Sequence, residues 1–379
     1  MRVLTVGNRY PADGGGGYEA VWRALVGGLR GRGDQVRVLS TDEPGPPMEG
    51  VDRTLRWLWR DGRWRRPARL EASRLARHDL RMLGDTLQAF KVDVVVWVSM
   101  GGLPLTLVGA SGLPELALVH DGWPLYGPQV DPHARREGWD PGAVSRWTCN
   151  SAFARTRVLE ALGERVDPVR FAVDHPGVPP ERVAGVAPAG VWAGRLALVG
   201  RVQEHKGGTT AVRALAQLPD ATLEIVGPPE DGHDAVLRAL AAACGVADRV
   251  SVHGATGDVA SVYARADAVL FPVTWPEPFG LVPLEAMAAG RPVVATATGG
   301  AAEYLRDGVN ALIVPVDDPA GLAAAVQRLA GDRALRDLLV RGGSATAARF
   351  TQEAWVAAML GHLDALAGGE CARPPRQTR

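Results

Sequence analysis

The sequence has little cysteine and no long apolar run. Its three cysteines, Cys149, Cys244 and Cys371, are far apart and odd in number, so they predict neither a disulfide framework nor a zinc site. Few cysteines suit a reducing cytoplasm, which is the location we expect. No apolar run reaches about 18 residues, so no membrane-spanning helix is predicted. The first residues lead directly into a predicted strand, without the pattern of a signal peptide.

Lysine is nearly absent, because 40 of the 42 basic residues are arginine and only Lys91 and Lys206 remain. This bias is typical of a GC-rich bacterial genome. A lysine that persists is a candidate for a tight site, since lysine and arginine are not equivalent there. The basic residues are balanced by 42 acidic ones, and a net charge of zero gives no overall attraction to nucleic acid or membranes. We expect no nucleic-acid partner.

The chain has 379 residues, a length that suits two domains. Strand and helix patterns alternate along it, which predicts doubly wound parallel sheets of the α/β class. In the second half, strands are predicted over 195–200, 222–226, 250–253, 268–271, 292–296 and 311–314, with helices near 207–217, 234–243, 257–266, 281–289 and 319–329. We expect an N-terminal domain over 1–178, a linker over 179–194 and a C-terminal domain over 195–350. A last helix over 351–367 is expected to pack back across the domain boundary, and it is followed by a disordered tail over 368–379.

Two carboxylates, Glu277 and Glu285, bracket a turn between a predicted strand and a helix that opens near Gly280. In a parallel sheet such a turn lies at the carboxyl edge, where ligands bind. The amides at the start of the helix suit a phosphate. By spacing alone, the two acids could equally be a helix cap and a solvated helix residue.

A second loop follows the predicted strand over 195–200 and carries two cations, Arg201 and Lys206, with glycines on both sides. Fixed cations at a strand end stabilise a diphosphate leaving group as it gathers negative charge. The alternative is a solvated surface pair.

The loop after the first strand contains four consecutive glycines, ending at Gly16 and Gly17. Because glycine has no side chain, this backbone can approach a diphosphate closely. Alternatively, the glycines only make the loop flexible and have no binding role. It does not match Gly-x-Gly-x-x-Gly, which disfavours a nicotinamide-dependent enzyme. His120 ends another predicted strand, where it is either structural or ligand-facing. The residues that follow, up to Tyr126, are predicted as its exit loop.

Arginine and tryptophan gather over residues 53–81, which hold ten arginines against three acids. A purely structural interpretation is a solvated basic surface with the tryptophans packed beneath it. The alternatives are an anionic acceptor site or a contact with a membrane surface. The pattern does not decide between these roles.

The stretch from Trp275 to Pro292 contains Glu-Pro-Phe-Gly and Leu-Glu-Ala-Met-Ala-Ala-Gly. It resembles the Glu-x7-Glu signature of the retaining glycosyltransferases of family 4, also called group 1. The Gly-Arg…Lys-Gly loop around Arg201 and Lys206 resembles a second motif of that family, and the resemblance covers nearly the whole chain. It implies the GT-B fold, with two facing Rossmann-like domains and an active cleft between them.

The resemblance also assigns roles to single residues. It implies a hexosyltransferase-type enzyme (EC 2.4) that transfers a sugar from a nucleotide-diphosphate-sugar donor to a hydroxyl-bearing acceptor with retention of configuration. The catalytic residues would be His120, Arg201, Lys206 and Glu277. The donor would also meet Gly16, Gly17, Phe279, Gly280, Leu281 and Glu285, with Glu285 on the ribose. The acceptor would lie near Asp121, Trp123 and Tyr126.

No Asp-x-Asp clamp precedes a suitable turn, so no metal and no other cofactor are expected. Asp317 and Asp318 suggest a helix cap instead. A nucleotide-sugar-binding protein or subunit without independent activity stays an alternative. A pyridoxal-phosphate-dependent phosphorylase is disfavoured, since Lys206 is assigned to the diphosphate. The sequence does not indicate the nucleotide base, the sugar, the acceptor, the linkage or the oligomeric state.

Overall fold

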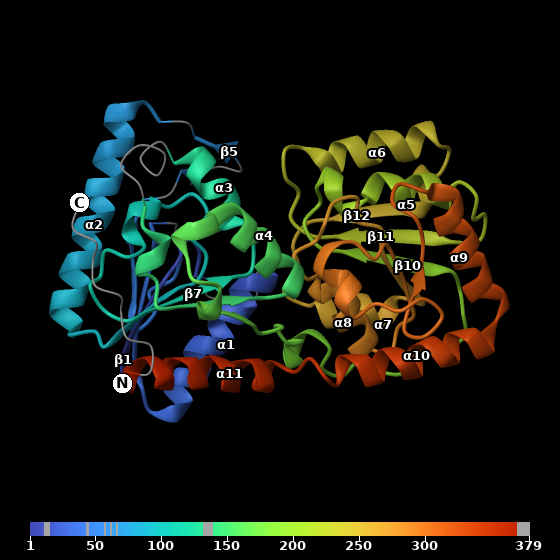
Figure 1. The fold of residues 1–379 in the computed structure, drawn as a ribbon. Coiled ribbons are helices and arrows are strands. Elements are labelled where there is room, and N and C mark those ends of the chain that lie inside the picture. The colour runs from blue at the N-terminus through green and yellow to red at the C-terminus, as the bar shows by residue number, and fades with distance from the viewer. Residues whose placement is uncertain are drawn as a thin grey trace. The chain divides into compact units, whose positions relative to one another are not determined.

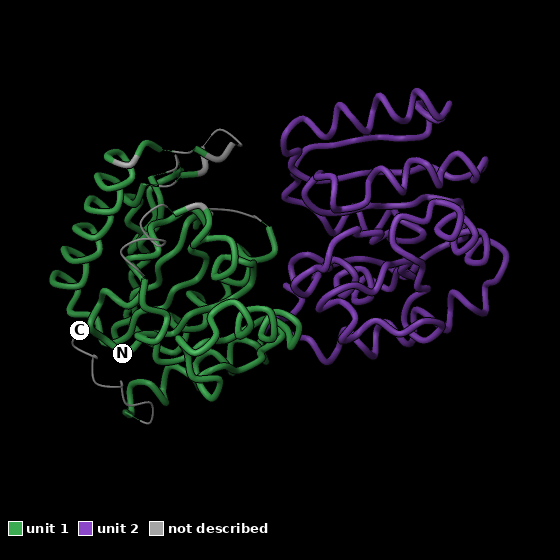
Figure 2. Tube along the Cα trace, turned by 45° about the horizontal axis from the view of Figure 1, so that its top comes forward, with its two compact units in different colours: residues 1–175, 353–379 green, residues 176–352 purple. Residues whose placement is uncertain are grey.

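The computed structural model describes residues 1–10, 16–42, 45–56, 58–60, 63–65, 67–131 and 139–369. The chain divides into two compact units, shown in green and purple in Figure 2. Unit 1 comprises residues 1–175 and 353–379, and unit 2 comprises residues 176–352. Of the tail predicted over 368–379, residues 370–379 lie outside the described residues.

Unit 1 is built on a seven-stranded sheet in the order β3-β2-β1-β6-β7-β8-β9, in which all neighbours are parallel. Its strands are β1 (Arg2–Val6), β2 (Gln35–Thr41), β3 (Val51–Leu55), β6 (Val94–Trp97), β7 (Glu115–Val119), β8 (Arg146–Cys149) and β9 (Phe171–Val173). Its helices are α1 (Gly17–Arg32), α2 (Arg69–Phe90), α3 (Trp123–Val130), α4 (Ala152–Leu162) and α11 (Gln352–Ala367), which enters the unit at Glu353 (Figure 1). A short antiparallel pair, β4 (Trp59–Arg60) and β5 (Arg63–Trp64), lies in the arginine-rich stretch.

Unit 2 is built on a six-stranded parallel sheet in the order β12-β11-β10-β13-β14-β15. Its strands are β10 (Arg195–Val199), β11 (Thr222–Val226), β12 (Val250–His253), β13 (Ala268–Phe271), β14 (Val293–Ala295) and β15 (Leu312–Ile313). Its α-helices are α5 (Gly208–Leu215), α6 (His233–Ala243), α7 (Val259–Arg265), α8 (Leu281–Ala288), α9 (Pro319–Gly331) and α10 (Arg333–Ala347). Unit 2 also contains the short 3-10 helices η6 (Pro180–Arg182), η7 (Glu204–Lys206) and η9 (Gly299–Glu303).

Both sheets have the same topology. In each, the first strand lies inside the sheet, the next two strands add on one side, and the chain then returns to the other side of the first strand. The strand order therefore reverses between β1 and β6 in unit 1 and between β10 and β13 in unit 2. In this fold class, ligands bind at the carboxyl ends of the strands beside such a reversal. Buried strands such as β6, with four buried residues of four, suit sheets covered on both faces. The predicted doubly wound Rossmann-like architecture is confirmed.

Several predicted elements agree closely with the structure. The strands β11, β12 and β13 have the predicted bounds. Asp318 caps α9 as expected, accepting from Gly321 N. In unit 1 the Ser151 side chain caps α4 by accepting a hydrogen bond from Ala154 N, and a single 3-10 turn, η1 (Leu105–Leu107), follows Pro104.

The segment over 179–194, expected to be a linker, belongs to unit 2 and contains η6. The chain passes from unit 1 to unit 2 after His175, near the expected boundary at residue 178. On its return, α11 docks on unit 1: His362 Nε2 lies 3.0 Å from Asp174 Oδ2, and Arg32 Nη1 lies 2.8 Å from Asp364 Oδ1. No helix in the described part of the chain combines the length and the apolar character that crossing a bilayer requires.

Candidate active site

The two loops that leave the reversal in unit 2 are in direct contact. One follows β10 and carries Arg201 and Lys206; the other follows β13 and carries Glu277. They meet at Gly207, whose backbone is in the left-handed region (φ +76°) and lies against Pro272 so closely that a Cβ would come within 1.9 Å of the Pro272 carbonyl oxygen. Thr274 N donates to His205 O at 2.9 Å and joins the loops a second time. The contact depends on a glycine at position 207.

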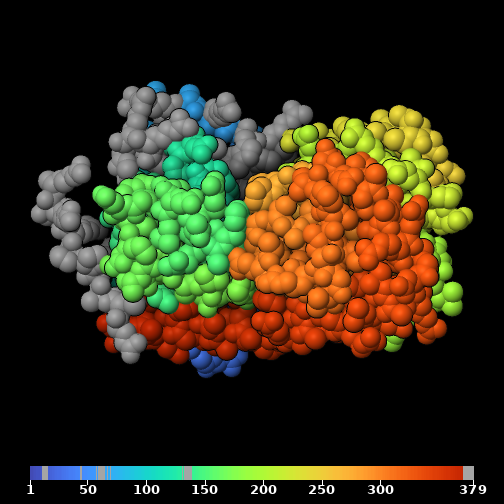
Figure 3. All heavy atoms as spheres, turned by 45° about the vertical axis from the view of Figure 1, so that its right-hand side comes forward, coloured from blue at the N-terminus to red at the C-terminus, as the bar shows by residue number. Residues whose placement is uncertain are grey.

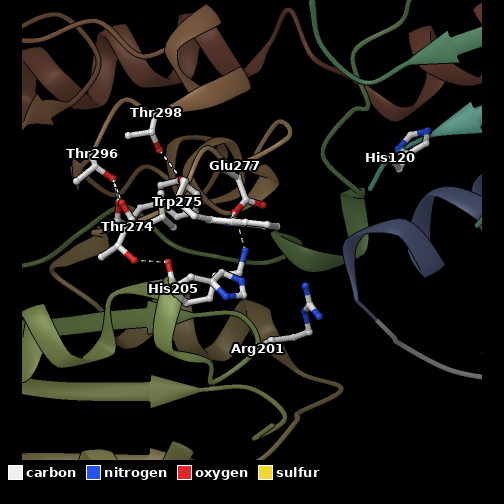
Figure 4. A network of polar contacts seen from close by, with 12 residues as sticks. His120, Arg201, His205, Thr274, Trp275, Glu277, Thr296 and Thr298 are labelled. Carbon is white, nitrogen blue, oxygen red and sulfur yellow. Dashed lines mark hydrogen bonds and ion pairs between the residues drawn. The ribbon is translucent and has the colours of Figure 1, made fainter. Parts of the chain in front are cut away.

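Lys206 and Glu277 form an ion pair at this junction, with Nζ 2.7 Å from Oε2 (Figure 4). The two side chains are only 15% and 14% exposed. Trp275 Nε1 also donates to Oε2, at 3.0 Å, so both bonds converge on one oxygen. Burial by itself would raise the pKa of Glu277, but attraction to the Lys206 ammonium and these hydrogen bonds outweigh it and lower that pKa. The carboxylate is therefore ionised at neutral pH.

His205 and Trp275 flank this pair. Their ring centroids are 4.4 Å apart, and Trp275 contacts Glu277 and His205 together (Figure 4). Burial, with the nearby charges of Lys206 and Arg201, lowers the pKa of His205 to about 4. The imidazole is thus neutral at pH 7 and adds no charge to the junction. Neither residue was singled out in the sequence, although Trp275 opens the motif.

Arg201 lies on the same loop as Lys206 but does not pair with Glu277. Its guanidinium is about half exposed, at 51%, and Nη1 lies 3.1 Å from Oε1 of Glu230. The structure therefore brings Lys206 and Glu277 together and leaves Arg201 at the surface beside them.

The backbone of the Glu277 loop is held from the opposite side. Gly300 N donates to Glu277 O at 2.8 Å, and Thr298 Oγ1 donates to Trp275 O at 2.8 Å. A Cβ on Gly299 would come within 2.3 Å of the Glu277 carbonyl oxygen, so this approach also requires a glycine. The segments that follow β13, orange in Figure 3, form much of the surface of unit 2 in that view.

The loop enters α8 through Gly280, at φ +84°. Phe279 is buried and packs on Tyr304, with ring centroids 5.3 Å apart, and the Tyr304 hydroxyl donates to Gly280 O. The first amides of a helix have no intrahelical acceptor, so the binding of a donor anion by those from Leu281 onward stays a prediction.

Glu285 is placed differently from the free ligand-facing carboxylate that the sequence suggested. Its side chain is 1% exposed, and both oxygens are engaged: the Tyr263 hydroxyl donates to Oε2 at 2.6 Å, and Arg182 Nε lies 2.5 Å from Oε1. The binding of a ribose by Glu285 stays a prediction. Arg182 and Tyr263 were missed, because neither lies near a recognisable motif.

His120 lies directly after β7, at the carboxyl edge of the sheet in unit 1. Its ring is edge-on to Trp355 of α11, with centroids 5.6 Å apart. Burial lowers its pKa to about 4, against the opposing charge of Asp174. Asn150 Nδ2 donates to the His120 carbonyl oxygen at 3.0 Å and fixes the backbone there. His120 is therefore a neutral, held imidazole at pH 7.

The predicted acceptor residues separate into two kinds. Tyr126 OH donates to Asp121 Oδ2 at 2.8 Å, and both side chains are partly exposed. Trp123 is fully buried, donates from Nε1 to Leu118 O, and stacks on Trp147 at 5.6 Å. The acceptor role predicted for Trp123 is corrected by this placement, since its ring belongs to the core. The predicted exit loop is also wrong here, because α3 begins at Trp123.

The glycine-rich loop of unit 1 ends in a helix start. Gly16 caps α1 and donates its N–H to the Glu19 carboxylate. Nearby, Asn8 Nδ2 donates to Gly101 O at 3.1 Å and ties the loop after β1 to the loop after β6. The binding of the diphosphate by Gly16 and Gly17 stays a prediction. The other two glycines of the run, Gly14 and Gly15, lie outside the described residues. Among the described residues, no cluster of three or more His, Cys, Asp and Glu side chains could hold a metal ion.

Two family models match the chain, one on each unit. The model of glycosyltransferase family 4 matches residues 15–182, and the model of glycosyl transferases group 1 matches residues 195–345. Together they cover both candidate loops and the Glu277–Glu285 motif.

Curated relatives carry related names. The D-inositol 3-phosphate glycosyltransferase of Xylanimonas cellulosilytica is 34% identical over 258 residues, which are 66% of this chain and 55% of that protein. The lipopolysaccharide core biosynthesis glycosyltransferase LpsE of Rhizobium meliloti is 36% identical over 163 residues, 43% of this chain and 47% of that protein. The chain thus spans about half the length of the curated relatives it matches.

Solved structures match over more of the chain. HepE of Anabaena in complex with UDP and glucose has a TM-score of 0.75 at 21% identity, covering 96% of this chain and 99% of that one. Sucrose-phosphate synthase of Thermosynechococcus elongatus has a TM-score of 0.76 at 21% identity, covering 97% of this chain and 100% of that one. At such identity these matches show the fold. The two family models show that the chain belongs to the family 4, or group 1, glycosyltransferases, and the structural matches show that it has their GT-B fold.

Proposed function

We propose that the chain transfers a sugar from a nucleotide-diphosphate-sugar donor to a hydroxyl group of a small-molecule, natural-product or glycan acceptor. The Lys206–Glu277 pair at the reversal of unit 2 carries this proposal. A nucleotide-sugar offers an anionic diphosphate beside neutral sugar hydroxyls. A cation and a carboxylate held in contact complement those two groups, one each. The complex of HepE with UDP and glucose, and the relatives named for transfer to D-inositol 3-phosphate, support this class of donor and acceptor.

The cations would act on the leaving group. When the bond between the anomeric carbon and the diphosphate oxygen breaks, the electron pair stays on that oxygen and negative charge gathers there. Lys206 is already held rigidly, so it stabilises this charge without reorganisation. Arg201 exchanges its surface partner Glu230 for the diphosphate, and the first amides of α8 add dipoles of the same sign.

The carboxylates and His120 would hold the sugar and the nucleoside. Glu277 is ionised, so it can only accept, and its Oε1 accepts from a sugar hydroxyl. Glu285 accepts from the ribose. His120, neutral at pH 7, offers one donor and one acceptor nitrogen to the reacting sugar. We propose attack by the acceptor hydroxyl on the face that the diphosphate leaves, with the departing phosphate taking the proton, which retains the configuration.

A thermal-shift panel tests the donor class. The purified chain is scanned with uridine-, guanosine-, adenosine- and thymidine-diphosphate sugars, starting with uridine because HepE is solved with UDP. A ligand that binds only the folded state raises Tm by mass action, so we expect one base to stand out. The best donor is then incubated with the chain alone to measure slow hydrolysis.

Three outcomes are distinguishable. Binding with hydrolysis or transfer supports the proposal. Binding without either supports a nucleotide-sugar-binding subunit instead, and the absence of any shift contradicts both. Activity that a chelator abolishes and manganese restores would overturn the expectation that no divalent cation takes part.

A further inference from the structure

The carboxylate of Glu285 lies in a small buried cluster that no motif predicts. Tyr263 of α7 donates to one oxygen at 2.6 Å, and Arg182 of η6 lies 2.5 Å from the other. Glu285 is 1% exposed and Arg182 is 18% exposed. An ionised carboxylate with so little access to water is stable only with a counter-charge and hydrogen bonds. Among the described residues, Arg182 is the cation that pairs with it.

Arg182 belongs to the segment by which the chain enters unit 2. A few residues earlier, Val178 forms a bridge with Thr351 and donates its N–H to Phe350 O at 3.0 Å, beside the point where the chain leaves the unit. A few residues later, Arg291 Nη2 donates to Ala187 O at 2.9 Å. The segment is therefore held at both ends, and Arg182 is presented to Glu285 from a fixed backbone.

The titratable groups that interact with Glu285 come from three elements. They are Arg182 of η6, Tyr263 of α7 and, at longer range, Tyr304 after η9. Burial, together with the charge of Glu285, raises the pKa of Tyr263 well above its ordinary value. The hydroxyl therefore keeps its proton at neutral pH and donates it to the hydrogen bond with Glu285. It cannot replace the positive charge of Arg182. Removing Arg182 would leave a buried carboxylate with one neutral donor and no counter-charge, and such a side chain loses the contact that holds it in place.

We infer that Arg182 is a positioning residue of the donor site, which keeps Glu285 charged and oriented to accept hydrogen bonds from the ribose of the nucleotide. This inference rests on the proposed function at one point, the contact between Glu285 and the ribose. Without the Arg182 guanidinium the Glu285 carboxylate loses its fixed orientation, so the nucleotide loses its hydrogen bonds there. The diphosphate and sugar contacts of Lys206 and Glu277 are unaffected.

The first test measures nucleotide affinity in Arg182→Met and Arg182→Lys. With the nucleoside diphosphate that the panel identifies, we expect Arg182→Met to raise Kd and donor KM about tenfold or more, with kcat little changed. Arg182→Lys should stay within a few-fold of the parent. The matched control is Arg265→Met, which removes an arginine from the exposed pair with Glu224 in the same unit.

The second test needs no ligand. Arg182→Met leaves the buried Glu285 carboxylate without its counter-charge, which destabilises the folded chain. Tm should therefore fall further in Arg182→Met than in Arg182→Met combined with Glu285→Gln, which buries no unpaired charge. If the parent binds no nucleotide, the proposed function fails while this readout still tests the pair.

Two results would overturn the inference. One is an Arg182→Met protein with the parent's Kd and the parent's Tm. The other is strict additivity of Arg182→Met and Glu285→Gln in nucleotide binding, since two groups that act through one contact are not additive. If Arg182→Met does not fold, Arg182→Gln against Arg265→Gln gives the same comparison with a polar side chain kept at each position.

Discussion

The ammonium of Lys206 lies 2.7 Å from Oε2 of Glu277, although 71 residues separate them in the chain. The topology of unit 2 explains the contact, because β10 and β13 are neighbours at the point where the strand order reverses. Their two loops leave the sheet side by side, and Gly207 lets them touch. Two motifs that are separate in the sequence thus form one site, in which a cation and an anion are in direct contact.

The Glu277 carboxylate predicts an acid-sensitive stability. Its folded-state pKa is below the ordinary 4.5, so its contribution is full above about pH 4.5 and is lost as pH falls through the lowered pKa. In Lys206→Met the carboxylate stays buried without its cation, and its pKa should rise instead. We expect the Tm of the parent to fall as pH decreases below 4.5. The Tm of the variant should instead fall as pH increases above 4.5. Identical pH profiles for the two proteins would contradict the pairing.

His120 should remain neutral down to unusually low pH. Its pKa is lowered to about 4 by burial, whereas the unfolded value is about 6.5, so its contribution to stability is full above pH 6.5 and declines as pH falls toward 4. NMR titration of the ring, assigned with His120→Gln, should show no midpoint above pH 5. Trp355→Leu removes the ring that covers the imidazole and should move the midpoint toward 6.5. A midpoint near 6.5 in the parent would refute the burial argument.

Asp79 predicts the opposite dependence on pH. This residue of α2 is fully buried, accepts a hydrogen bond from Arg56 N at 2.9 Å, and burial raises its pKa to about 7. The unfolded chain ionises first, so the parent loses stability as pH rises from about 4 through 7, by about 1.4 kcal/mol for each pKa unit at most. Asp79→Asn keeps the acceptor and removes the charge. Its Tm advantage over the parent should therefore grow between pH 5 and pH 8.

The control for Asp79→Asn is Asp85→Asn, on the exposed side of the same helix, which should leave Tm unchanged at every pH. An advantage that stays constant with pH would show that Asp79 is ionised throughout. This measurement also reports on the arginine-rich stretch, because Asp79 ties the end of β3 to α2 beneath it. The role of that stretch toward an acceptor or a membrane surface stays a prediction.

Gly207→Ala tests the contact between the two loops. An alanine there meets the Pro272 carbonyl at 1.9 Å and must also adopt φ +76°, so the loops have to separate. Gly245→Ala is a matched control, since Gly245 has φ +70° but no atom within 4 Å of an added Cβ. The control should cost about 1 kcal/mol from backbone strain alone. Gly207→Ala should cost more and should weaken nucleotide binding; equal costs would show that the loops do not need the contact.

Local signals predicted much of the fold. Buried runs bounded by turns predicted β11, β12 and β13, and Asp318 was expected as the cap of α9. The helix α10 was missed because Gly342 and Gly343 weaken a helical pattern. Their reason is tertiary: a Cβ on Gly342 would clash with Val309 O, and one on Gly343 with Met287. Such close approaches leave no trace in the periodicity of the sequence.

The site was predicted where motifs carry it and missed where distant segments complete it. The loops of Lys206 and Glu277 were named from their position at strand ends. Arg182 lies in a stretch that reads as a linker, and nothing local links it to a carboxylate about 100 residues later. Trp123 was assigned to an acceptor from its position after β7, but its indole stacks on Trp147 of the neighbouring strand and belongs to the core. Long-range packing decided both cases.

The most direct test of the account is sugar turnover by Lys206→Ala. With the donor that the panel identifies, turnover of the variant should fall about ten- to a hundredfold, because a charge-assisted contact contributes about 1.5–3 kcal/mol. Arg265→Ala, which removes a cation from an exposed ion pair of the same unit, should leave turnover unchanged. Folding of both variants is checked by Tm. Turnover of Lys206→Ala equal to that of the parent would contradict the assignment of this lysine to the departing diphosphate.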